Sequence, residues 1–134
     1  MGAEKTPDRS LRCGAEVTME SMHDVREELR QPAIDLRGLI PEVMKGYATL
    51  SGASMAAGEL PVATKELLAT VIAITRECDG CIVSHTRGAA RNGVTRQEMA
   101  EAIGVAIMMN GGPGTVWGPR ALRSFDESLA DLRS

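Results

Sequence analysis

Residues 61–93, PVATKELLATVIAITRECDGCIVSHTRGAARNG, predict two helices with a break between them. Apolar residues from Leu67 to Ile74 recur at helical spacing, with polar residues between them. The break is expected near Asp79, where one helix ends and the next begins. Gly93, after an asparagine, is a stop signal for the second helix. This stretch therefore predicts a helical fold.

The rest of the chain favours the same class, because no stretch shows the sustained period of two that a strand needs. Aromatic residues make up 2% of the chain and there are eight methionines, which suits helix packing. Pro32 is expected to end the first helix, and Thr95 with Glu98 matches a capping box. We predict an all-α fold of about six helices, near residues 21–31, 41–51, 61–78, 80–91, 96–110 and 117–132.

Length and charge limit the possible functions. A chain of 134 residues predicts one domain, here residues 19–134, preceded by a flexible polar arm over 1–18. The net charge is −3 and no basic run occurs, which argues against nucleic-acid binding. The longest nearly apolar stretch, 103–109, is too short to span a bilayer, and the N-terminus lacks the apolar run of a secretory signal. We expect a cytoplasmic protein, in which a close cysteine pair indicates redox or metal chemistry.

Cys78, Cys81 and His85 fall within eight positions, although the chain has only three cysteines and two histidines. At about 100° per residue, Cys81 lies at about 300° and His85 at about 340° from Cys78, on one helix face. A helix N-terminus favours a thiolate, and Cys-x-x-Cys there permits a short-range disulfide. His85, one turn after Cys81, can accept or relay a proton. This arrangement indicates a reactive thiol with a second thiol and a base.

A zinc site is the competing interpretation of these residues. Cys78, Cys81 and His85 supply three ligands, whereas structural zinc takes four. His23 is remote in sequence, and Glu66 would be an uncommon fourth ligand. A metal-binding or structural module therefore stays open as an alternative.

Three blocks between about residues 59 and 131 carry a family resemblance: KELLATVIAITRECDGCIVSHTRGAARNGVT, QEMAEAIGVAIMMNGGPG and VWGPRALRSFDE. The most specific element is Glu66, eleven residues, Cys78-x-x-Cys81, three residues and His85. On these residues the chain resembles the carboxymuconolactone decarboxylase superfamily, and within it the AhpD-like alkylhydroperoxidases. The resemblance implies an all-helical fold that forms homo-oligomers, commonly trimers or hexamers.

The resemblance also implies an antioxidant thiol-dependent peroxidase. Cys81 would attack a hydroperoxide, Cys78 would resolve the sulfenic acid as a disulfide, and Glu66 with His85 would form a proton relay. An external dithiol, such as a lipoyl or thioredoxin-like protein, would reduce the disulfide, without a bound cofactor or metal. One position departs from the pattern: peroxidase members carry a second histidine immediately before the attacking cysteine, where this chain has Gly80.

The decarboxylase branch acts on a small lactone and lacks the cysteine pair, so the two cysteines argue against it. An enzyme acting on a lactone or another small molecule, with a vestigial cysteine pair, is the second alternative. Other features have structural interpretations. Cys13 is expected to be a free thiol in the arm. Gly111 to Gly114 is read as a turn, because it lacks the Lys-Ser/Thr of a phosphate-binding loop. Arg87 and Arg91, four apart, are expected to form a solvated face rather than an anion site.

Overall fold

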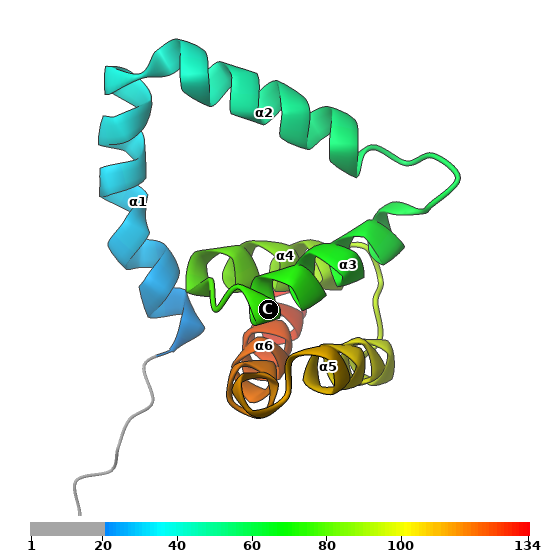
Figure 1. Ribbon diagram of the computed structural model, residues 1–134. Helices are drawn as coiled ribbons and strands as arrows, with labels where there is room; N and C mark the ends of the chain where they lie inside the picture. Colours follow the sequence, from blue (N-terminus) through cyan, green and yellow to red (C-terminus); the bar gives the residue numbers. More distant parts are fainter. Residues whose placement is uncertain (1–20) are drawn as a thin grey trace, which may run out of the picture.

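A computed structural model describes residues 21–134, and within that range it contains six α-helices and no strand (Figure 1). The predicted all-α class is therefore confirmed, while the predicted arm over 1–18 and Cys13 lie outside the described residues. Across the described part of the chain, no helix has both the length and the hydropathy needed to cross a membrane. The helices are α1 (Met22–Leu39), α2 (Pro41–Met55), α3 (Val62–Thr75), α4 (Asp79–Arg91), α5 (Arg96–Asn110) and α6 (Gly112–Asp131).

The hydrophobic core lies among α3, α4, α5 and α6, which we call the body (Figure 1). Its largest fully buried apolar side chains are Ile74, Ile82, Met99 and Phe125, one from each helix. Buried alanines from all four helices fill the space between them, so the helices approach closely with little aromatic bulk. Among the residues of α1 only Met22 is buried, and α2 buries none.

Glycines set the closest approach in the body, where α6 crosses α5. A Cβ on Gly114 would lie 2.8 Å from the backbone Cα of Ile107, and one on Gly118 would lie 2.7 Å from a side-chain carbon of Ile103. Larger residues at these positions would push the helices apart. The interpretation of Gly111 to Gly114 as a turn was therefore mostly wrong. Only Gly111, with φ of 65°, forms the turn, and α6 starts at the next residue.

α1 does not end at Pro32 as predicted but continues through it to Leu39. Proline removes one backbone donor, which leaves the carbonyl of Glu28 without its helical partner. Residues 26–43 are all exposed, so water has access to that carbonyl and the helix tolerates the loss. After Ile40, Pro41 occupies the first turn of α2, as predicted.

The pair α1 and α2, which we call the hairpin, projects from the body (Figure 1). α1 leaves the body near Met22, and α2 leads back toward the start of α3. Most of the hairpin's large apolar residues are exposed, in contrast to those of the body. The hairpin therefore contributes little to the core of this chain.

Candidate active site

The break between α3 and α4 places the cysteine pair at a helix start. Glu77 adopts a φ of 54°, which is uncommon for a residue with a side chain, and this turns the chain back on itself. The backbone N–H of Cys78 then donates to the carbonyl of Ala73 at 3.1 Å. The predicted break near Asp79 is confirmed, and α4 packs back against α3.

Cys78 is the N-cap of α4 and not a residue within the helix. Its Sγ accepts a hydrogen bond of 3.3 Å from the backbone N–H of Cys81. The side-chain cap stabilises the first turn, and the same N–H favours negative charge on Cys78 Sγ when the sulfur is reduced.

Cys78 and Cys81 form a disulfide, with 5.2 Å between their Cα atoms. This separation lies within the usual range for disulfides, because Cys78 has extended backbone and can turn toward the helix. Cys81 is exposed and Cys78 is half-buried. The pairing expected for the two cysteines is present, and Cys81 is the sulfur that a solute reaches more easily.

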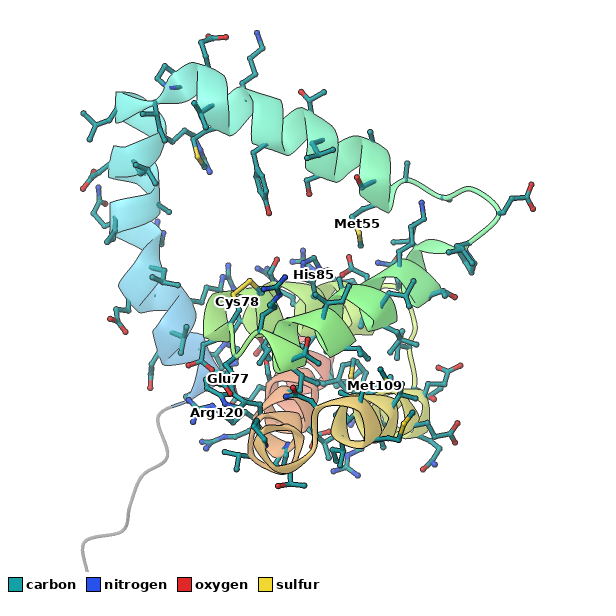
Figure 2. All side chains as sticks on the ribbon, in the orientation of Figure 1. Met55, Glu77, Cys78, His85, Met109 and Arg120 are labelled. Carbon is teal, nitrogen blue, oxygen red and sulfur yellow. A yellow bond between two sulfur atoms is a disulfide. The ribbon has the colours of Figure 1, made fainter. Side chains whose placement is uncertain are left out.

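Glu66 and His85 meet across the α3–α4 pair, as predicted. Nδ1 of His85 lies 2.8 Å from Oε2 of Glu66. The Glu66 side chain is 13% exposed and the His85 side chain 30%, so the bond is shielded while the ring still reaches the surface. With Nδ1–H donating to the carboxylate, Nε2 is left to accept or deliver a proton. Figure 2 shows Cys78 and His85 on the side of the body that faces the hairpin.

Gly88 supports this pair, and sequence reasoning did not single it out. A Cβ at Gly88 would overlap the carboxylate of Glu66, so only glycine leaves room for that carboxylate against α4. Gly88 lies three residues after His85, on the same helix face. A glycine in the middle of a helix, one turn after the candidate base, was the available signal.

Gly80, where the resembling peroxidases carry a histidine, lies against the hairpin. A Cβ here would lie 3.2 Å from Cδ1 of Leu29 in α1. A larger side chain at this position would have to displace the end of Leu29. A histidine here, as in the resembling peroxidases, would therefore require α1 to pack less closely against residues 78–81.

Asp79 and Arg120 fix the start of α4 on α6. Arg120 donates from Nε at 3.3 Å and from Nη2 at 3.2 Å to the two carboxylate oxygens of Asp79, and its guanidinium lies 4.8 Å from the ring centre of Trp117. Deeper in the body, the hydroxyls of Thr86 and Ser124 share a buried hydrogen bond of 2.7 Å. These contacts hold α4 in place beneath the cysteine pair. They join two different helices, so the periodicity of either helix in the sequence could not reveal them.

No group of three or more His, Cys, Asp or Glu side chains within residues 21–134 is arranged to hold a metal ion. His23 instead lies near the far end of α6, 3.5 Å from Asp131 and 3.8 Å from Glu127. Of the two fourth zinc ligands considered from the sequence, His23 lies beside α6, and Glu66 is bonded to His85.

Fold and site together define a small all-α protein with a Cys-x-x-Cys disulfide beside a Glu–His pair. Residues 41–124 match the model of the carboxymuconolactone decarboxylase family, and the chain belongs to that family. The match begins at Pro41, so it includes α2, whereas the resemblance seen in the sequence began only near residue 59. α2 is thus part of the family's shared fold.

Three similar proteins were found, and one of them is named as a member of this family. An uncharacterized protein of Cupriavidus necator is 38% identical over 86 residues, which cover 64% of this chain and 76% of that protein. An uncharacterized protein in the cox locus of Paracoccus denitrificans is 37% identical over 81 residues, covering 60% and 73% respectively. The crystal structure of an apo carboxymuconolactone decarboxylase family protein from Legionella pneumophila has a TM-score of 0.78 and 31% identity, covering 81% of this chain and 96% of that one.

Proposed function

We propose that this protein is a thiol-dependent peroxidase that reduces hydroperoxides and is recycled by an external dithiol. The observation that carries the proposal is the Glu66–His85 hydrogen bond of 2.8 Å one helical turn from a disulfide-forming cysteine. A disulfide alone is compatible with structural bridging. A carboxylate-oriented imidazole next to it supplies the proton transfer that peroxide reduction needs.

In the first step His85 takes the proton of the Cys81 thiol, and the thiolate attacks the terminal oxygen of the hydroperoxide. The O–O bond breaks, an S–O bond forms, and the leaving alkoxide takes the proton from His85 as an alcohol. Glu66 stabilises the imidazolium between these two transfers. Exposure of Cys81 and its spacing to His85 support its role as the attacking thiol.

In the second step the thiol of Cys78 attacks the sulfenic sulfur of Cys81, and water leaves as the disulfide forms. One thiol of an external dithiol, of lipoyl or thioredoxin-like type, then attacks the exposed sulfur of Cys81 and expels Cys78, which leaves a mixed disulfide between the donor and Cys81. The second thiol of the donor attacks the donor sulfur of this mixed disulfide and expels Cys81, so both cysteines return to thiols. The N–H of Cys81, 3.3 Å from Cys78 Sγ, stabilises the leaving thiolate of Cys78. The donor ends as a disulfide, so two electrons balance each turnover.

Mass mapping of thiols before and after one equivalent of peroxide tests the proposal. We expect Cys81→Ser to abolish the reaction, and Cys78→Ser to accumulate sulfenic acid on Cys81 without turnover. Cys13→Ser, the matched control, should react as the unmodified protein does. If Cys78→Ser is the variant that cannot react, the order of the two cysteines is reversed.

The family name suggests a different reaction, decarboxylation of a small lactone, which needs no redox pair. Turnover of carboxymuconolactone by a protein with both Cys78 and Cys81 replaced by serine, without peroxide reduction by the unmodified protein, would establish that alternative.

A further inference from the structure

A cleft between α1 and α4 gathers an unusual number of arginines. Its volume is about 610 Å³, and its lining includes Arg26, Arg30 and Arg37 from α1 and Arg87 and Arg91 from α4. On α1 these residues are spaced by four and seven, and on α4 by four, so each set lies along one side of its helix. The two arginines expected to form a solvated face thus meet three others across a cleft.

The charge of this lining is opposite to that of the whole protein. The chain has a net charge of −3, yet five of its twelve arginines line this one cleft. Glu66 is the acidic residue of the lining, and its carboxylate is bonded to His85. Among the described residues, one of these five arginines forms an ion pair: Arg30 lies 4.0 Å from Glu27, and both side chains are exposed. Such a pair neutralises little of the charge.

Arg87 lies among like charges in this cleft. Burial lowers the pKa of Arg87 from its usual value, and the charges of Arg26 and Arg91 lower it further. Asp131 acts in the opposite direction as the smallest contribution. A bound anion would relieve this repulsion, because its charge is opposite to that of the guanidinium groups. Charge-assisted hydrogen bonds from guanidinium groups to a carboxylate are also strong.

Apart from the arginines, Glu66 and Ser84, the lining is apolar or glycine. Leu29, Ala33 and Ile34 of α1 face the cleft with Val83 of α4, and Leu29 and Ile34 remain 49% and 48% exposed. A cleft of this size lies within the range of small-molecule sites, which combine apolar walls with a few placed charges. The arrangement suits an organic anion with an apolar body better than a bare inorganic ion.

The cleft also reaches the redox site. Glu66 and Gly80 belong to its lining, and Gly80 lies between the two cysteines. Gly80 directly precedes Cys81, so a ligand that extends from the arginines as far as Gly80 would bring one end beside Cys81. We propose that this cleft selects hydroperoxides that carry a carboxylate on an apolar body, with the arginines binding the carboxylate. This proposal rests on the peroxidase function proposed above.

Binding tests the cleft without any redox reaction. Octanoate and octanol are matched probes that differ in charge, and both are titrated calorimetrically into the oxidised full-length protein. We expect octanoate to bind at least about tenfold more tightly than octanol, as expected for a charge-assisted contact. Arg26→Gln with Arg91→Gln should remove this preference. Arg76→Gln with Arg133→Gln, which removes the same charge outside the cleft, should preserve it.

Three binding results would overturn the proposal. Equal affinity for octanoate and octanol would show that the arginines recognise no carboxylate. An equal loss of the preference for octanoate in Arg76→Gln with Arg133→Gln would show that only the overall charge of the protein matters. Inorganic phosphate binding as tightly as octanoate would show that the apolar wall contributes nothing.

Kinetics connects the cleft to the reaction. Cumene hydroperoxide and its para-carboxylate derivative offer the same O–O bond with and without an anion. We expect faster oxidation of Cys81 by the carboxylate, and about a tenfold or larger loss of that rate, but not of the neutral rate, in Arg26→Gln with Arg91→Gln. Equal rates in the unmodified protein would overturn the substrate class and leave the peroxidase intact. Octanoate binding without oxidation by either hydroperoxide would instead reject the peroxidase and keep the anion site.

Discussion

The body and the hairpin differ in how much of their apolar surface is buried. The body, α3 to α6, supplies every buried core residue except Met22, and it holds both cysteines, His85 and Glu66. The hairpin leaves most of its large apolar side chains exposed. The core of the body therefore sets the geometry of the cysteine site, whereas the hairpin supplies one wall of the cleft beside it.

The largest contrast should appear in stability. Phe125 is fully buried, so Phe125→Ala should lower the free energy of unfolding by about 3–5 kcal/mol through lost burial and a cavity. Leu39 in the hairpin is 79% exposed, and Leu39→Ala should change it by no more than about 0.5 kcal/mol. Urea unfolding at several protein concentrations measures both. Equal losses would mean that body and hairpin form one cooperative core.

The second contrast concerns chemistry within the body. Glu66→Gln keeps the size of the side chain but removes the charge that stabilises the imidazolium. We expect oxidation of Cys81 by peroxide to slow by about 10- to 1,000-fold, with fold and assembly preserved. Stopped-flow measurement of thiol oxidation gives the rate.

Glu59→Gln, an exposed glutamate before α3, is the matched control and should leave the rate unchanged. An unchanged rate in Glu66→Gln itself would show that the bond to His85 is only structural, and the proposed function would lose its main support.

Most of the body was predictable from sequence, because helix signals are local. The Thr95–Glu98 capping box is present at the start of α5, and the break between α3 and α4 lies near Asp79 as predicted. The Glu66–His85 contact was also predicted, but from the family spacing. Periodicity alone places the two residues on separate helices and does not say how these helices pack.

The missed features all depend on contacts between elements. The room that Gly88 leaves for Glu66, and the position of Leu29 against Gly80, exist only after α1, α3 and α4 have packed. Proline usually disrupts a helix, so Pro32 predicted a helix end. α1 continues because the carbonyl that Pro32 leaves unpaired is accessible to water. The arginine cleft was invisible for the same reason, because its two halves are far apart in the chain.

The third contrast concerns assembly. Val43, Tyr47 and Leu50 recur on one side of α2 and are 64%, 66% and 65% exposed. We expect a homo-oligomer, a trimer or hexamer, in which a second copy covers this side. Leu50→Glu should reduce the assembly mass in light scattering, because it buries a charge in the interface.

Thr49→Glu adds the same charge to another side of α2 and should leave the mass unchanged. A monomer at micromolar concentration in the unmodified protein would contradict the predicted assembly. The apolar side chains of the hairpin would then be exposed in the protein in solution as well.

The smallest effect is expected at the capping box of the body, formed by Thr95 with Glu98 at the start of α5. At α5, the backbone N–H of Thr95 and then its hydroxyl hold the pKa of Glu98 below its usual value of 4.5. A lowered folded-state pKa means that the stabilisation is complete above pH 4.5 and is lost as the pH falls through the folded-state value. Glu98→Gln should therefore show a smaller fall in urea stability on acidification than the unmodified protein. Thr95→Ala keeps the backbone N–H, the larger cause, and should retain most of the pH dependence. The same fall in all three proteins would show that the α5 cap contributes nothing to acid stability.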